Sequence, residues 1–312
     1  MLASHGTFHH VYDFDEFELP FGLPPIHLPN LGGFQVTKFM VLQVVAVLLT
    51  LLIFRGLSRR LRGGQPASGM FWNFWEMLAL YIRDEVVRPI IGDPHAHGGH
   101  DHDHPEHSET LHGHQHPLGD AMHAELTQKS SHAANGGHPA DKFLPFIWSC
   151  FFYILFCNLL GAFPLLGSAT GSIAVTGALA VAAFLATFVY GAQVHGFGGF
   201  WLALVPSMDA PGPLKLFLTP MMFVIEVIGL FIKHGVLAVR LFANIMGGHT
   251  VLGVILAFIS AAAHSGAWSV VTGGSVLGQV GVGLLELLVA FIQAYVFVFL
   301  TTIFIGMSLH EH

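Results

Sequence analysis

Two apolar stretches near the C-terminal end of this sequence carry side chains that could move a proton or an ion. In the first, Glu226, Lys233 and Arg240 recur at intervals of seven residues. Seven residues make two helical turns less about 20°, so the three side chains are predicted to lie along one face of a helix. Asn244 is one turn beyond Arg240 on the same side. His249 comes five residues later and is expected to point elsewhere.

The second apolar stretch places Glu286 and Gln293 seven residues apart, and therefore on one helix face. A charged side chain in hydrocarbon is costly, and ionisable residues found there usually mark an ion or proton path. Arg240 and Glu286 lie well inside apolar runs, so a purely structural role explains them least. Lys233 could instead extend its ammonium group to the membrane surface or mark a helix break with the following His-Gly pair. Other polar residues could simply pair or hydrogen-bond within a helix bundle; they are Glu226, His249, Asn158 and Gln293.

The acid–base chemistry of these side chains separates their roles. Arginine has a pKa above ~12 and does not release its proton, but it can keep a carboxylate ionised and repel a cation. Histidine and glutamate can titrate near neutral pH once burial or a partner shifts them. We therefore predict a proton wire of Glu286 and His249 with the polar Asn244 and Gln293, beside a fixed positive gate, Arg240. Such a gate needs a carboxylate that moves past it, and the few acidic residues of this chain offer no obvious candidate. We therefore expect this carboxylate to belong to another protein.

The composition is that of a polytopic membrane protein. Of 312 residues, 53% are hydrophobic and only 10% are charged, whereas soluble domains carry about 25% charged residues; the mean hydropathy is +0.64. The 12 Lys and Arg against 19 Asp and Glu form no basic face, which argues against nucleic-acid binding. No signal peptide is expected, because residues 1–33 lack a basic start and a short apolar core. Cys150 and Cys157 are expected to be packing residues.

The hydrophobic pattern predicts an all-α protein of about five membrane helices, each long enough to cross ~30 Å of hydrocarbon. A single helix over 214–263 would be about 75 Å long, so it either folds into two helices or lies strongly tilted. Residues 264–279 are expected to form an uncharged Gly/Ser loop. Arginines follow the first span at once, so the N-terminus is expected outside and the C-terminus in the cytoplasm. The predicted spans are 34–54, 143–166, 173–193, 214–263 and 280–307.

Residues 70–91 differ from the spans, because their apolar side chains form a stripe at helical spacing. This pattern favours an amphipathic helix in the membrane interface, although a helix packed on a partner fits as well. We divide the chain into an extracytoplasmic, irregular tail, the first span with the interfacial helix, a His-rich cytoplasmic insertion, and a helical channel domain. The segments are 1–33, 34–91, 92–141 and 142–312.

The insertion holds 12 of the 22 histidines in a Gly- and Asp-rich stretch. Such a composition cannot build a core and predicts disorder. The segment could be dispensable, or it could bind a transition metal loosely, since histidine is a common ligand but no fixed spacing is present. The histidines of such a loose site would be His95, His97, His100, His102 and His104.

Three stretches of the sequence resemble one known family. "RLFANIMGGH" and "LLELLVAFIQAYVFVFLTTIF" are similar to subunit a of the F-type ATP synthase, whose pattern is Arg-Leu-Phe-x-Asn on one long helix and an ionisable residue seven before a glutamine on a second. Arg240, Asn244 and the Glu286/Gln293 pair fall on those positions. "KFLPFIWSCFFYILFCNLLGAFP" resembles the family's second span, and the likeness covers most of residues 34–91 and 142–309. Some members have glutamate where this chain has His249, and histidine in place of Glu286.

The resemblance implies a function and partners. It implies two proton half-channels that meet at Arg240, against a ring of c subunits whose carboxylate takes the proton. Protons would enter past Asn244, His249, Glu286 and Gln293 and leave past Glu226. The last two helices would be tilted against the ring. The b subunits of the peripheral stalk, lipid and a bacterial inner membrane are also implied. No cofactor is expected, no phosphate-binding loop is present, and the chain would not be an enzyme by itself.

Two rival functions fit part of the sequence. A divalent metal transporter, such as a zinc carrier, would account for the His-rich loop, but the spans lack paired His and acidic residues at one-turn spacing. A purely structural membrane scaffold leaves Arg240 and Glu286 unexplained.

Overall fold

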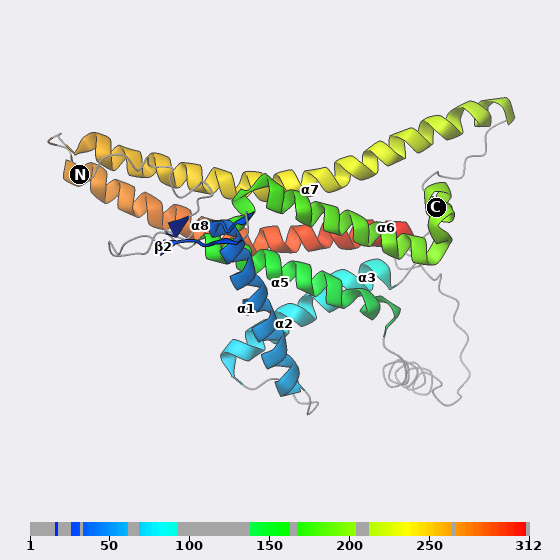
Figure 1. Ribbon diagram of the computed structural model, residues 1–312, viewed down its shortest axis with the longest axis horizontal. Coiled ribbons are helices and arrows are strands. Elements are labelled where there is room, and N and C mark those ends of the chain that lie inside the picture. The colour runs from blue at the N-terminus through cyan, green and yellow to red at the C-terminus, as the bar shows by residue number, and fades with distance from the viewer. Residues whose placement is uncertain are drawn as a thin grey trace, which may run out of the picture.

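Long apolar helices make up most of the chain in its computed structural model (Figure 1). The structure describes residues 16–17, 26–31, 34–61, 69–92, 138–162, 167–203, 212–263, 266 and 268–309. Five helices in these segments are long and apolar enough to cross a membrane, as predicted. They are α1 (Lys38–Leu61), α5 (Leu144–Gly161), α6 (Ile173–Ala203), α7 (Gly212–Ala262) and α8 (Trp268–Leu309).

Shorter elements connect or flank these helices. The helix α2 (Met70–Tyr81) continues through a π-helical turn, η3 (Ile82–Val87), into α3 (Arg88–Ile91). Two 3-10 turns, η4 (Pro139–Phe143) and η5 (Ala169–Gly171), precede α5 and α6. Two antiparallel pairs of strands lie before α1, where an irregular tail was predicted; β1 (Glu16–Phe17) pairs with β2 (Ile26–His27), and β3 (Asn30–Leu31) with β4 (Phe34–Gln35).

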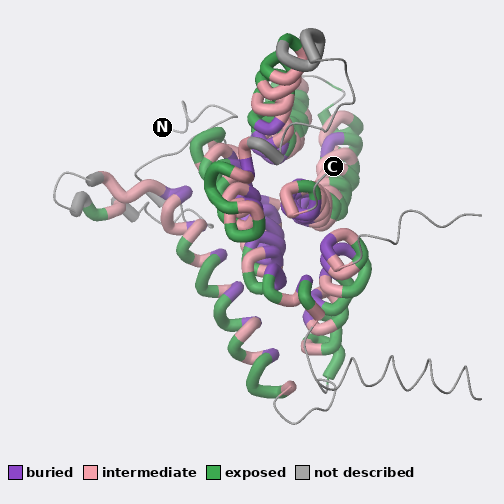
Figure 2. Tube along the Cα trace, turned by 90° about the vertical axis from the view of Figure 1, so that its right-hand side faces the viewer, coloured by how far each residue is buried: buried purple, intermediate pink, exposed green. Residues whose placement is uncertain are grey.

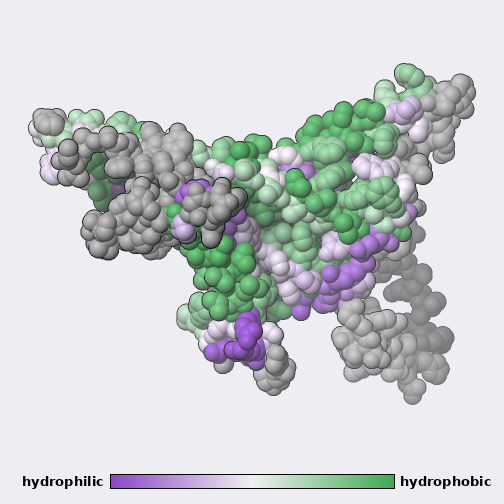
Figure 3. All heavy atoms as spheres, in the orientation of Figure 1, coloured by the Kyte–Doolittle hydropathy of each residue, from purple (hydrophilic) through white to green (hydrophobic). Residues whose placement is uncertain are grey.

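The core lies where α5, the inner face of α6 and the C-terminal half of α8 meet. Phe152 of α5, Phe297 and Ile305 of α8 are almost completely buried there. Figure 2 shows that burial is confined to the sides of the helices that face one another, while the outer sides are exposed. Hydrophobic side chains cover much of that exposed surface, as the hydropathy view shows (Figure 3). Such a surface is typical of a protein in contact with lipid or with other membrane subunits.

The amphipathic segment 70–91 packs its apolar stripe on the bundle. Trp75, Ile82 and Val86 are buried, whereas Phe71 at the start of the stripe stays exposed. Trp75 lies against Phe156 of α5, with ring centroids 5.3 Å apart. The stripe therefore has a partner within the chain itself, and the interfacial location stays a prediction.

The two C-terminal helices are longer and more continuous than the sequence pattern indicated. The α7 helix is one unbroken element of 51 residues, which supports the long-helix alternative for 214–263. The predicted loop over 264–279 is wrong, because α8 already begins at Trp268. Its N-terminal half packs beside α7 (Figure 1), and this packing outweighs the ~1 kcal/mol that each interior glycine costs in helix propensity. In α6, the helix runs to Ala203 past a kink at Gly196, where φ is 77°.

An ion-pair cluster joins the two ends of the His-rich segment. Arg88 donates from Nε and Nη2 to the two carboxylate oxygens of Asp141, at 3.1 and 3.0 Å, and from Nη1 to Asp84 at 3.2 Å. These hydrogen bonds raise the pKa of Arg88, and a hydrogen bond from Arg83 lowers the pKa of Asp84. Gly92 and His138, at the two ends of the segment, lie close together, since a Cβ atom on Gly92 would collide with the ring of His138. The histidines of the predicted loose metal site lie outside the described residues.

Replacing residues 93–137 by a short Gly-Ser linker should leave the helical fold intact, because the two ends already meet. We expect wild-type amounts in the membrane fraction and an unchanged thermal transition by circular dichroism in detergent. Adding Asp141→Asn removes the ion pair to Arg88 and should lower stability by at most about 1 kcal/mol, since the pair is partly exposed. A shortened chain that no longer accumulates in the membrane would contradict this prediction.

Candidate functional site

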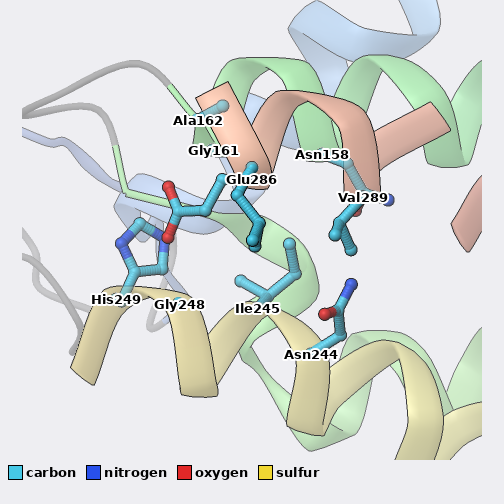
Figure 4. Close-up of a pocket in the computed structure, with 10 residues that line it drawn as sticks. Asn158, Gly161, Ala162, Asn244, Ile245, Gly248, His249, Glu286 and Val289 are labelled. Carbon is cyan, nitrogen blue, oxygen red and sulfur yellow. The ribbon is translucent and has the colours of Figure 1, made fainter. Parts of the chain in front are cut away.

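A cavity of about 70 Å³ lies between α5, α7 and α8 (Figure 4). By the same measure a single water needs roughly 10–15 Å³, so the cavity has room for a few waters. Its polar lining comes from all three helices: Asn158 of α5, Asn244 and His249 of α7, and Glu286 of α8. The structure thus brings together three of the predicted site residues and adds Asn158.

The placement of His249 corrects the prediction that it points away from Asn244. Both side chains line the cavity, together with Ile245 and Gly248 between them. Residues 244, 245, 248 and 249 form a broad stripe on one side of a helix, because each pair four apart is nearly stacked. The whole stripe therefore lines the cavity.

Glu286 and His249 form the centre of the site. Figure 4 shows the carboxyl group of Glu286 and the imidazole of His249 turned toward each other from the two helices. Gly248 makes this approach possible, since a Cβ atom there would collide with the carboxyl group of Glu286. An acid and an imidazole that face each other in a cavity with room for water can pass a proton between them.

A hydroxyl pair positions Asn158. This side chain is 1% exposed, and its Oδ1 accepts a hydrogen bond from Oγ1 of Thr170 at 2.9 Å. Ser168 and Thr170 are themselves joined at 2.8 Å between their hydroxyl oxygens. The Nδ2 of Asn158 has no hydrogen-bond partner among the described residues, so it is free to donate into the cavity that it lines. Nothing in the sequence marks Ser168 or Thr170 as functional, because they lie in a short turn between two predicted spans.

Arg240 lies outside the cavity, on an exposed face of α7 one turn before Asn244. Within the part of the chain that the structure describes, its guanidinium makes no hydrogen bond or ion pair. The neighbouring exposed side chains Val236 and Val239 are apolar. A permanent charge on such a surface is costly without a counter-charge.

The predicted common face of Glu226 and Lys233 is confirmed. The Nζ of Lys233 lies 3.2 Å from Oε1 of Glu226, and both side chains are more than a third exposed. The possible helix break after Lys233 is absent from this helix, which continues through His234. Gln293 is buried in α8 and does not line the cavity, so the structure does not join it to Glu286 there.

No group of three or more His, Cys, Asp or Glu side chains among the described residues could hold a metal ion. A metal-transport site within the helices is therefore not supported by this part of the chain.

Comparison with known proteins points to one family. Residues 122–306 match the family model described as the ATP synthase A chain, a match that begins within the segment 92–141. The chain is 34% identical to the ATP synthase subunit a of Chloroherpeton thalassium, over 97% of this chain and 76% of the relative. It is 41% identical to subunit a of Myxococcus xanthus, over 89% and 75%. With subunit a of Anaeromyxobacter dehalogenans it shares 42% identity over 57% and 44%.

Gly248→Ala should push the carboxyl group of Glu286 away from α7 and slow proton transport by about ten- to a hundredfold, because small misplacements of reacting groups cost this much. Transport is measured as acidification of inverted membrane vesicles. Gly247→Ala is the matched control, since a Cβ atom there meets no described group within 4 Å. Equal transport by the two variants would show that the close approach has no role.

Proposed function

The chain belongs to the ATP synthase subunit a family, and we propose that it forms the two proton half-channels at the interface with the ring of c subunits. It would couple proton flow through the membrane to rotation of the ring and so to ATP synthesis. The observation that carries the proposal is an arginine without a partner in the described chain, on an exposed face one turn from a cavity with a facing acid and imidazole. The bond-making chemistry of ATP would belong to other subunits.

The cavity serves as the entry half-channel. A proton that arrives from the outer side is taken by His249 or Glu286 and exchanged between them through the cavity. Asn158 and Asn244 hold water in the same space, because their amides can both donate and accept hydrogen bonds. Gln293, two turns farther along α8, would extend the polar path by one group. The last acceptor is the carboxylate of a c subunit.

Arg240 acts as the gate between the half-channels. A protonated c-subunit carboxyl group that approaches the guanidinium is driven to release its proton, because a nearby positive charge favours the ionised form. The same charge repels a proton that would cross directly from one half-channel to the other. Arginine suits this role because it stays charged throughout the cycle.

The proton leaves on the cytoplasmic side, past Glu226. This carboxylate lies two seven-residue intervals before Arg240 on the same face of α7. Its ion pair with Lys233 is partly exposed, on the side where the ring would pass. A carboxylate held by a lysine can receive a proton from the ring and pass it to water, while the ammonium group balances its charge in between.

The partners and orientation follow from the same proposal. The long exposed faces of α7 and α8 would lie against the c-ring, and the b subunits of the peripheral stalk and lipid would cover other apolar surfaces. Arg55, Arg59 and Arg60 in the last turns of α1 favour a cytoplasmic end there. With five crossings, the N-terminus would lie outside a bacterial inner membrane and the C-terminus in the cytoplasm. None of the relatives described above favours the zinc-transporter alternative.

Arg240→Ala should abolish ATP-driven acidification of inverted vesicles while the complex still assembles, because the gate charge is lost. Assembly is checked by co-purification of the complex from the membrane. Val239→Ala, at an exposed neighbouring position, is the control and should pump normally. Unchanged pumping by Arg240→Ala would make the arginine a structural residue and remove the basis of the proposal.

Glu286→Gln should slow proton flow by at least about tenfold without affecting assembly, because a positioned acid–base group is lost. Glu85→Gln is the matched control, because it makes the same isosteric change on an exposed carboxylate away from the cavity. Proton flow is followed by vesicle acidification at several imposed pH gradients. Equal flow in both variants would exclude Glu286 from the path.

A further inference from the structure

One histidine outside the proposed proton path is buried where three helices meet. His234 of α7 is 4% exposed. Its ring lies beside Phe184 of α6 and Phe304 of α8, with centroids 5.4 and 4.9 Å away. The Nδ1 atom is 2.9 Å from the carbonyl oxygen of Leu230, one turn earlier in α7. The Nε2 atom is 3.4 Å from Oγ1 of Thr187, so His234 links α7 to α6 through polar atoms.

The contacts around His234 need three donated protons, but a neutral imidazole and the hydroxyl group of Thr187 provide only two. Thr187 Oγ1 also lies 3.0 Å from the carbonyl oxygen of Ala183. A carbonyl only accepts, so a neutral imidazole must use its single N–H toward Leu230. The single hydroxyl proton of Thr187 then serves either His234 or Ala183, but not both. A second proton on the imidazole, at Nε2, would fill every contact in the chain.

The charged group nearest to the imidazole belongs to α7 itself. Lys233 precedes His234, and its ammonium group is paired with Glu226 at 3.2 Å. The groups that meet the ring from the other two helices do not titrate. They are Phe184 and Thr187 of α6 and Phe304 of α8. Protonation of the imidazole is therefore opposed first by the burial of the ring among apolar side chains and second by Lys233, while the carbonyl oxygen of Leu230 favours it.

Thr187 also connects to the third helix. The Oγ of Ser308 in α8 lies 3.3 Å from the carbonyl oxygen of Thr187 and 2.7 Å from that of Ile305, so its single hydroxyl proton is shared between the two helices. Thr187 of α6 therefore contacts both neighbouring helices: its side chain meets His234 of α7, and its carbonyl oxygen meets Ser308 near the end of α8. A polar contact in an otherwise apolar helix interface can fix the register of the helices.

We propose that His234 is a positioning residue: a proton on its Nε2 tightens the link to Thr187 and fixes the rotation of α7 that presents Arg240. Arg240 is six residues farther along the same unbroken helix, so a rotation at His234 is carried to the guanidinium. The consequence for coupling rests on the proposed function, whereas the tightened link is a property of the helices themselves.

The test uses the purified full complex with wild-type subunit, His234→Gln or Thr187→Val. Amide hydrogen exchange over residues 183–187 and 230–234 is measured from about pH 4.5 to about pH 8, a range extended to the acidic side because burial disfavours the charged imidazole. After correction for the intrinsic pH dependence of exchange, the wild type should slow by about tenfold at the acidic end, because a charge-assisted hydrogen bond is added. Neither variant should show this slowing. ATP-driven pumping by the same samples should lose the matching pH-dependent component.

Two further variants separate the link from general packing. Thr187→Ser keeps the hydroxyl and should restore the wild-type response. Thr302→Val removes a buried hydroxyl that donates to Val298 of its own helix, at 2.8 Å, and should leave the response unchanged.

Acid-dependent slowing in both His234→Gln and Thr187→Val would overturn the proposal, and so would its absence from the wild type. If the wild-type complex did not pump protons at all, the proposed function would fail, while the exchange data would still decide the link.

Discussion

Arg240 cannot lose its proton, so in an apolar environment its charge needs an opposite charge or water beside it. The rest of the fold has to meet this requirement. The guanidinium has no partner in the described chain and stands among exposed apolar side chains. Removing it from water costs several kcal/mol unless another charge approaches it. The helices present Arg240 outward rather than burying it, so the missing counter-charge is expected from another subunit. If that counter-charge is a carboxylate on a moving subunit, the unfavourable free energy of the unpaired guanidinium would favour the approach of each ionised carboxylate in turn.

The continuity of α7 follows from the same apolar surroundings. Backbone polar groups within a bilayer must be paired inside their own element, so a loop in the middle of the 51-residue run would leave carbonyl and amide groups unpaired. One long helix pairs almost all of them, with Pro220 as the interior residue that has no N–H to donate, and carries Glu226, Arg240 and His249 on one element. The α8 helix runs beside it for the same reason, even through a glycine-rich stretch. The acid and the imidazole that face each other across the pair can then be held in a fixed relation.

The sequence allowed the helices and most polar positions to be predicted, because both depend on local spacing. The seven-residue repeat correctly placed Glu226 and Lys233 on one face, and hydropathy located the five long helices. Predictions failed where distant segments decide the outcome. The start of α8 was missed because its glycines favour a loop unless α7 lies alongside. The role of Asn158 cannot be decided from the sequence, because its hydroxyl partners approach only where the chain turns back between α5 and α6.

Three sides of α7 are polar for three different reasons, and under the proposed function this division would let one helix both bind and move protons. The outer side carries Glu226, Lys233 and Arg240, whose charges are open to a partner. The cavity side carries His249, which can exchange a proton with an acid on α8. The inner side carries His234, whose contacts hold the helix against its neighbours. Because the helix is unbroken, a change in the inner contact would alter the angle at which the outer charges and the cavity side are presented. On the proposed function, positioning and proton transfer would then be linked through the backbone of α7.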